Sequence, residues 1–387
     1  MSLIVYTGAF RFPCGDAASA RVLNNAKILR ELGYDVLFLS WGRGVEQKTR
    51  GCYQGFRYIC TDDLCSNARF PISRLFHFFF LGHRALKIMN RPDIRPSAVI
   101  IYDAPAYFST KMLSYCQQRT IPLISDIDEW FDNAEFPGGK FAPPAWLNNW
   151  NMRNLQSRIA NKIVISSWLE HYYKKNHCIL LPPLIDLNEL KWNRKDERSN
   201  NNCVRLIYAG TPTHKDLLEV IISAVIKAVE AGARLELNIL GINESQIESC
   251  VSVVKKRVPQ FIHFLGKVPQ EEVPSYYAKS DFSLLIRPVN RKMTAGFPTK
   301  FVESMGAQCP VIATEFSDIS YYLKHGENGF LVEDCTEESL CRILLRLNDL
   351  SSNQLKIMKK SAYKCAFESF HYYNYLDKMR SFLMSLQ

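Results

Sequence analysis

Lys300 and Glu303, a lysine and a glutamate three residues apart, are the side chains of this sequence best placed to bind a charged ligand. Pro298, two residues before Lys300, suits the first turn of a helix, and Thr299 lies between them. The spacing puts both charged groups on one helix face near its N-terminus, where free backbone N–H groups favour an anion such as a diphosphate. An ordinary ion pair on a surface helix would show the same spacing.

The elements that must position these residues follow a pattern that occurs twice. Residues 3–40 read as strand, loop with Gly8, Pro13 and Gly15, helix and strand, and a second start of the same kind begins at residue 204. The strands expected in the first half are residues 3–6, 35–40, 98–102, 122–125 and 162–166. Those expected in the second half are residues 204–209, 235–240, 262–265, 282–286 and 311–313. The sequence therefore predicts an α/β fold of two doubly wound, Rossmann-like domains facing across a cleft, with ligands at the carboxyl ends of the strands.

The boundary between the domains is expected in the polar run 195–202, where all periodicity stops. This gives an N-terminal domain over residues 1–195 and a C-terminal domain over residues 203–369. A last helix is expected at about 370–387, after the second sheet is complete. The sequence leaves open whether this helix crosses back to the first domain.

Composition excludes several classes of protein. The 387 residues are 47% hydrophobic, which is enough for two cores. The twelve cysteines form no C-x-x-C pair and follow no signal-peptide pattern, so we expect reduced thiols in the cytoplasm. The histidines show no H-x-x-x-H pair, no apolar run is long enough to span a membrane, and the net charge of +10 is spread over both halves. We therefore expect no bound metal and no nucleic-acid partner.

One basic and aromatic segment, residues 69–95, differs from the rest of the chain. It carries six basic residues and one acid, and it contains the apolar ridge of residues 75–81. Such a ridge with basic flanks is typical of helices at a lipid headgroup boundary, which predicts a peripheral protein on the inner face of the cell membrane. A buried helix with a charged outer edge is the alternative.

Six segments, in this order and spacing, carry a resemblance to a known family. They are Gly8–Gly15, Ile207–Gly210 with Lys215, Phe264–Pro269, Tyr277–Phe282, Lys300–Ala313 and His325–Val332. Together they resemble the family 4 retaining glycosyltransferases of the GT-B fold. The resemblance implies that the C-terminal domain holds a nucleotide diphosphate sugar, UDP- or GDP-linked, as co-substrate, and that no cofactor is needed.

The resemblance also implies roles for residues of the donor site. Glu303 would hydrogen-bond the ribose hydroxyls, and Lys215 with Lys300 would neutralise the diphosphate. The implied donor-binding set is Gly15, Gly210, Thr211, Lys215, Gly241, Lys267, Val268, Pro298, Thr299, Lys300 and Glu303. Two positions depart from the family: Ala295 replaces the first of two glutamates, and Thr211 replaces an arginine.

The acceptor is expected to bind the N-terminal domain. The loop Ser125–Trp130 looks like the acidic, tryptophan-containing loop of relatives that act on lipid-linked sugars. The implied acceptor-binding set is Asp16, Arg21, Asp103, Asp126, Asp128, Glu129 and Trp130, and the implied catalytic set is Lys215, Glu303 and Asp128. Asp126 and Asp128 also form a D-x-D pattern, the metal signature of another glycosyltransferase fold, but that fold lacks a second complete α/β domain. A solvated loop at the strand end is the alternative for these acids.

The function expected is therefore transfer of a sugar to a lipid-linked saccharide during synthesis of a surface polysaccharide such as lipopolysaccharide or capsule. A sugar-nucleotide 2-epimerase shares the two-domain fold. A non-catalytic nucleotide-sugar-binding subunit is a further alternative, made possible by Ala295 and Thr211. A dehydrogenase is disfavoured because neither half contains a G-x-G-x-x-G turn followed by an acid.

Overall fold

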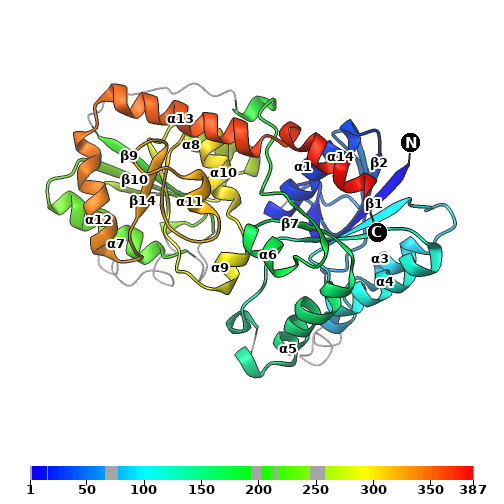
Figure 1. The fold of residues 1–387 in the computed structure, drawn as a ribbon. Coiled ribbons are helices and arrows are strands. Elements are labelled where there is room, and N and C mark those ends of the chain that lie inside the picture. Colours follow the sequence, from blue (N-terminus) through cyan, green and yellow to red (C-terminus); the bar gives the residue numbers. More distant parts are fainter. Residues whose placement is uncertain are drawn as a thin grey trace. The chain divides into compact units, whose positions relative to one another are not determined.

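The structure, a computed structural model, describes residues 2–14, 16–65, 77–136, 138–192, 203–211, 216–244 and 258–386. The chain divides into two compact units. The first unit takes residues 1–184 together with 372–387, and the second takes residues 185–371. Each unit is built on a sheet of mostly parallel strands with helices packed against it, as Figure 1 shows.

Within the described residues, the first unit has an eight-stranded sheet in the order β3-β4-β2-β1-β5-β6-β7-β8. Its strands are β1 Leu3–Phe12, β2 Asp35–Arg43, β3 Arg50–Tyr53, β4 Phe56–Cys60, β5 Ala98–Tyr102, β6 Leu123–Ile127, β7 Asn161–Val164 and β8 His177–Leu180. Only β3 and β4 pair antiparallel; the other described neighbours are parallel. Its helices are α1 Ala17–Glu31, α3 His83–Met89, α4 Ala106–Arg119, α5 Pro143–Trp150, α6 Ser167–Tyr172 and α14 Leu376–Met384.

Alternate residues of β1 define the two layers of this unit. Ile4 and Tyr6 belong to one apolar core, with residues of α1 and α14. Val5 belongs to the other, with residues of α3 and α4. Because successive side chains of a strand point to opposite faces, the sheet is covered by helices on both sides.

The second unit has a six-stranded sheet, counted over the described residues, in the order β11-β10-β9-β12-β13-β14. Its strands, all parallel, are β9 Val204–Ala209, β10 Leu235–Leu240, β11 Ile262–Gly266, β12 Phe282–Leu285, β13 Val311–Thr314 and β14 Gly329–Val332. Its helices are α7 Leu218–Glu230, α8 Val273–Ala278, α9 Arg291–Ala295, α10 Thr299–Gly306, α11 Ile319–Tyr322, α12 Glu337–Arg346 and α13 Ser352–Phe370. The α/β fold predicted for both halves is confirmed.

Three local predictions were wrong. Strand β1 continues to Phe12 through the expected loop, because Phe10 and Phe12 are fully buried in the core. Strand β6 continues through Asp126 to Ile127, where a loop was expected. The predicted last helix is a 3-10 turn, Tyr372–Tyr375, followed by α14. The predicted linker 195–202 lies outside the described residues.

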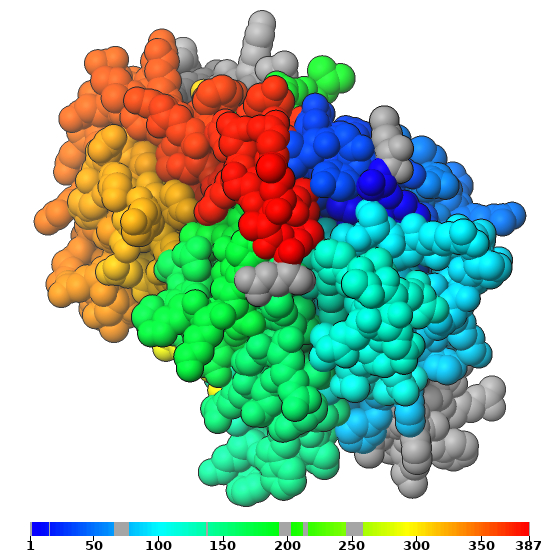
Figure 2. Space-filling model, turned by 45° about the vertical axis from the view of Figure 1, so that its right-hand side comes forward, coloured from blue at the N-terminus to red at the C-terminus, as the bar shows by residue number. Residues whose placement is uncertain are grey.

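The C-terminal segment completes the first unit. Tyr372, Met379 and Phe382 are buried in the same core as α1. Lys378 Nζ donates a hydrogen bond to Leu180 O at 3.0 Å, and the Phe382 ring stacks on His177 with 4.7 Å between centroids. Figure 2 shows this segment in red beside α1 in blue. Among the described residues, no helix combines the length and apolarity that crossing a membrane would require.

Candidate functional site

The carboxyl ends of three neighbouring strands in the second unit meet through glycines. Gly210 follows β9 and Gly241 follows β10, with φ angles of +138° and +108°. Gly241 N donates to Gly266 O at 2.8 Å, and a Cβ at Gly241 would lie 2.4 Å from Gly210 O. Both positions therefore require glycine, because a Cβ would clash with the neighbouring strand end at Gly241 and with Lys300 at Gly210. Lys267, which is exposed, and Val268 follow on the third strand end.

A cluster of charges lies at the same strand ends. Lys300 Nζ, from the first turn of α10, donates to Asp216 Oδ2 at 2.6 Å. Arg287 Nε donates to Asp216 Oδ1 at 2.6 Å, and Tyr208 OH donates to Asp216 Oδ2 at 2.8 Å. A Cβ at Gly210 would lie 2.4 Å from Lys300 Nζ, so the glycine also makes room for this lysine.

This cluster sets two basic side chains, Lys300 and Arg287, against the single carboxylate of Asp216. Burial alone would raise the pKa of Asp216, but Lys300 and Arg287 lower it to about 2. Burial lowers the pKa of Lys300, and the Asp216 carboxylate opposes that shift. With Asp216 ionised, the surplus positive charge is available to an anionic ligand.

Glu303 lies one turn after Lys300 on α10 and is half-buried. Burial raises its pKa to about 7, although Lys191 and Lys300 oppose the shift. No described residue donates a hydrogen bond to this carboxylate, so it can accept one from ligand hydroxyls. Pro298 is buried just before the helix and Thr299 begins it, as predicted from the sequence. Thr211 is exposed, and Lys215 lies outside the described residues.

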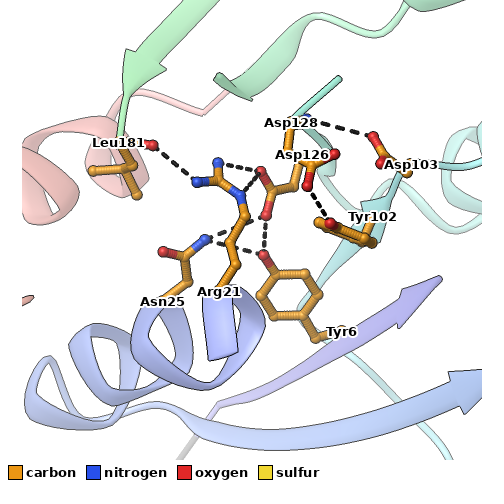
Figure 3. Close-up of polar contacts among 8 residues, drawn as sticks. All are labelled: Tyr6, Arg21, Asn25, Tyr102, Asp103, Asp126, Asp128 and Leu181. Atoms are coloured by element: carbon orange, nitrogen blue, oxygen red, sulfur yellow. Dashed lines mark hydrogen bonds and ion pairs between the residues drawn. The ribbon is translucent and has the colours of Figure 1, made fainter. Parts of the chain in front are cut away.

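The first unit has its own polar cluster, centred on the buried carboxylate of Asp126 (Figure 3). Arg21 Nη2 and Nε donate to Asp126 Oδ1 at 2.6 and 3.1 Å, and Arg21 Nη1 donates to Leu181 O at 2.9 Å. Asn25 Nδ2 and Tyr6 OH donate to Asp126 Oδ2. Both charged side chains are buried. Their hydrogen-bonding groups are occupied by each other and by Leu181, Asn25 and Tyr6. The geometry gives Arg21 and Asp126 a positioning role, and their predicted contact with the acceptor stays a prediction.

Asp103 and Asp128, at the ends of β5 and β6, are more accessible than Asp126. Asp128 Oδ2 accepts a hydrogen bond from Tyr102 OH, while Oδ1 has no partner among the described residues (Figure 3). Asp103 Oδ1 accepts a hydrogen bond from Asp128 N at 3.4 Å. Burial and the neighbouring Asp128 raise the pKa of Asp103 well above its usual range. Carboxyl groups at the ends of two neighbouring strands can exchange hydrogen bonds with the hydroxyls of a ligand.

The other predicted acceptor residues differ in exposure. Asp16 caps α1, because its side chain accepts a hydrogen bond from Ser19 N at 2.8 Å; burial and Asp128 raise its pKa. Glu129 is half-buried, whereas Trp130 is 2% exposed and packs edge-on against Trp168. Trp130 therefore contributes packing. Gly15 lies outside the described residues.

A cavity of about 350 Å³ opens next to this acidic loop, entirely within the first unit. Asp103 and Glu129 line it together with many apolar side chains, among them Phe78 and Leu81 of the predicted ridge. Several polar side chains that line the cavity already form hydrogen bonds within the protein. Ser125 Oγ donates to Gln156 Oε1 at 2.7 Å, and Asn151 Nδ2 donates to Ala104 O at 3.0 Å. The cavity therefore offers apolar walls and a few carboxyl groups. Residues 69–76 of the predicted membrane segment lie outside the described residues.

The part of the chain that the structure describes offers no side-chain cluster of the kind that holds a metal ion. No group of three or more His, Cys, Asp or Glu side chains is placed there to hold an ion. Asp126 of the D-x-D pattern is occupied by Arg21, so the pattern does not form a pair of open carboxylates.

Sequence reasoning missed residues in both clusters. Arg287 and Asp216 follow predicted strands or loops directly, so the rule that ligands lie at carboxyl ends of strands could have identified them. Tyr6, Asn25 and Tyr102 gave no such signal, because they lie inside a strand, a helix and a strand whose residues were assigned to the core.

Comparisons with known proteins relate part of the second unit to a family and the whole chain to a fold. Residues 203–349 match the family described as Glycosyl transferases group 1. Over 160 residues, the chain is 26% identical to the amylovoran biosynthesis glycosyltransferase AmsK of Erwinia amylovora, a match covering 41% of this chain and 39% of that protein. The match thus spans about two fifths of the curated relative.

Similar solved structures cover the whole chain. HepE of Anabaena, in complex with UDP and glucose, superposes with a TM-score of 0.69 at 14% identity over 100% of both chains. WaaG, a glycosyltransferase involved in lipopolysaccharide biosynthesis, superposes with a TM-score of 0.66 at 12% identity over 99% of both chains. The chain therefore has the GT-B fold, and its residues 203–349 carry the sequence pattern of the glycosyl transferases group 1.

Proposed function

We propose that this protein transfers a sugar from a nucleotide diphosphate donor to a saccharide acceptor. The observation that carries the proposal is the Lys300–Asp216–Arg287 cluster at the strand ends of the second unit, inside the region that matches the family. Anomeric C–O cleavage places negative charge on the leaving diphosphate, and fixed cations that face this charge stabilise the transition state. The surplus cation of the cluster suits that role.

The donor contacts follow from the same geometry. The diphosphate binds at the strand ends beside Gly210 and Gly241, next to Lys300 and Arg287. Arg287 supplies a second cation and so compensates for Thr211, where the family has an arginine. The carboxylate of Glu303 accepts hydrogen bonds from the ribose hydroxyls. HepE was solved with UDP-glucose, which supports a UDP-linked donor.

The acceptor binds the first unit, at the ends of β5 and β6. Asp103 and Asp128 exchange hydrogen bonds with hydroxyls of the acceptor, while Arg21 and Asp126 hold these strand ends in place. AmsK and WaaG, by their names and descriptions, act in the synthesis of amylovoran and of lipopolysaccharide, which supports a lipid-linked saccharide of a surface polysaccharide as acceptor. We extend the proposal to retention of configuration and to a peripheral location on the inner face of the membrane.

The test measures binding and transfer separately. A panel of nucleotide sugars is screened for thermal stabilisation of the protein, and then for sugar transfer and donor hydrolysis. Glu303→Gln and Lys300→Met should each lower the rate by about 30- to 1000-fold, equivalent to about 2–4 kcal/mol. Lys356→Met, an exposed lysine of α13, is the matched control and should keep the wild-type rate.

The outcomes separate the proposed enzyme from a binding subunit. Wild-type turnover in both site variants at saturating donor would remove these residues from the site. A protein that is stabilised by a nucleotide sugar but neither hydrolyses nor transfers it, with any acceptor tried, would be a nucleotide-sugar-binding subunit.

A further inference from the structure

The helical segment from Pro143 to Arg158 has two faces of different character. It comprises α5, a π-helical turn Asn151–Leu155 and a 3-10 turn Gln156–Arg158. Its inner face is held in the fold: Ala145 and Leu155 are buried, and Leu147 and Met152 line the cavity of the first unit.

The outer face of this segment presents large aromatic side chains to solvent. Trp146 is 60% exposed and Trp150, one turn later, is 47% exposed. Phe141, just before the helix, is 72% exposed. Figure 1 shows α5 projecting from the rest of its unit, and Figure 2 shows the same segment at the lower edge of the view. Aromatic side chains on a projecting helix are typical of an interaction surface.

The charge of the segment has one sign. From residue 138 to residue 158 the sequence contains no Asp or Glu, whereas Lys140, Arg153 and Arg158 are all exposed. Arg153 follows Trp150 by three residues, in the π-helical turn that continues the helix. The nearest acid before the segment, Glu135, accepts a hydrogen bond from Asp132 N at 3.1 Å in a capping box. The face is thus both apolar and basic.

The polar edge of one indole is already satisfied. Trp146 Nε1 donates to Lys140 O at 2.7 Å. This bond orients the ring and removes the cost of burying its N–H group in an apolar medium. The ring is therefore ready to enter the boundary between lipid headgroups and acyl chains.

We propose that Phe141, Trp146 and Trp150, with Lys140, Arg153 and Arg158, form a face that binds an anionic lipid bilayer. Aromatic side chains partition into the interfacial layer, and the basic groups are attracted to anionic headgroups. The face differs from the ridge at residues 75–81 predicted from the sequence. In that ridge Phe78 and Leu81 line the cavity, and the exposed Phe80 packs against the Tyr107 ring at 5.1 Å.

Vesicle flotation tests this surface without needing turnover, so its result is independent of the proposed reaction. The wild-type protein is mixed with phosphatidylcholine vesicles with and without phosphatidylglycerol. We expect flotation only with the anionic vesicles, weakened by salt. The triple variant Phe141→Ser, Trp146→Ser, Trp150→Ser should bind about tenfold or more weakly while it keeps the wild-type circular dichroism and melting temperature, because all three side chains are exposed.

A matched control uses another exposed aromatic residue. Tyr321, in the second unit, is 79% exposed and lies between Asp318 and Glu327 in sequence. Tyr321→Ser should float like the wild type. A charge variant, Lys140→Glu with Arg153→Glu and Arg158→Glu, should lose the preference for anionic vesicles.

A second measurement uses the unmodified protein. Brominated acyl chains quench tryptophans that enter the bilayer, so we expect quenching of wild-type fluorescence that is lost in Trp146→Phe, Trp150→Phe. Absence of wild-type binding to anionic vesicles would overturn the proposal, as would a triple variant that floats normally. Loss of binding only in the variant Phe78→Ser, Phe79→Ser, Phe80→Ser would show that the ridge, and not this face, binds the membrane. A wild type that ignores vesicles but self-associates through this face would make it an interface between copies of the chain.

Discussion

Asp126 is a carboxylate in the interior of the first unit whose partners come from distant parts of the chain. Its ion pair with Arg21 is buried, with side-chain exposures of 3% and 0%. Burial raises the pKa of Asp126, and Arg21 opposes this shift. Removing one partner of such a pair leaves an uncompensated charge in a region that water does not reach.

Arg21→Met should therefore lower the free energy of unfolding of the first unit by about 3–5 kcal/mol. Denaturant unfolding followed by fluorescence measures this change. The double variant Arg21→Met, Asp126→Asn should recover part of the loss, because it removes the unpaired charge. Arg342→Met, at an exposed pair with Glu333, should change stability little. A small effect of Arg21→Met would contradict the role of this pair in holding the strand ends.

The buried amine of Lys162 should make the free energy of unfolding depend on pH. Its Nζ is buried in β7, donates to Gln156 O at 2.6 Å and lies 4.9 Å from the centre of the Tyr173 ring. Burial lowers its pKa to about 7, compared with about 10.4 in an unfolded chain. Between these values the unfolded state binds more protons than the folded state, so the free energy of unfolding rises as pH increases above about 7.

The measurement compares unfolding at pH values from about 7 to 8.5 in the wild type and in lysine variants with the same thiols, because unfolded thiols with a pKa of about 8.5 also begin to titrate there. Each pKa unit of difference is worth about 1.4 kcal/mol. We therefore expect the free energy of unfolding of the wild type to rise by about 1–2 kcal/mol over this pH range. Lys162→Met should flatten the rise, and Lys175→Met, at an exposed lysine, should retain it. An unchanged slope in Lys162→Met would show that another group titrates.

Among the helices and strands, those that consist of a continuous apolar run were predicted correctly from the sequence. Strands β5 and β9 lie within one residue of the expected ranges, since their side chains are buried almost throughout. The edge strand β3 was missed because it is mostly exposed, and its neighbour β4 was missed because it is short and its buried residues alternate with more exposed ones. Helix α13 was missed because most of its surface is polar, and its helicity depends on a capping box at Ser351 and on packing against α10.

The candidate site was predictable only where chemistry and strand ends coincide. Lys300 and Glu303 could be named because their spacing fits one helix face. The extension of β6 through Asp126 could not, because burial of a carboxylate in a strand depends on Arg21, 105 residues away. The local sequence around Asp126 gives no sign of this distant partner. The acid was therefore interpreted as part of a solvated loop.

For the molecule as a whole, we predict that sugar transfer needs no divalent metal. Lys300 and Arg287 are the cations that we propose to balance the charge of the leaving diphosphate. Activity in excess EDTA should stay within about twofold of the untreated value, whereas loss of a needed metal would cost orders of magnitude. Full dependence on magnesium or manganese would reassign the role of these cations and return attention to Asp128.

The return of the chain to the first unit has a consequence for biosynthesis. Tyr372, Met379 and Phe382 complete the core beneath α1, yet they leave the ribosome after every residue of the second unit. The second unit can thus finish its sheet while the first still exposes apolar surface to chaperones. A premature stop codon just after residue 371 would therefore damage the unit that was translated first and spare the one translated last.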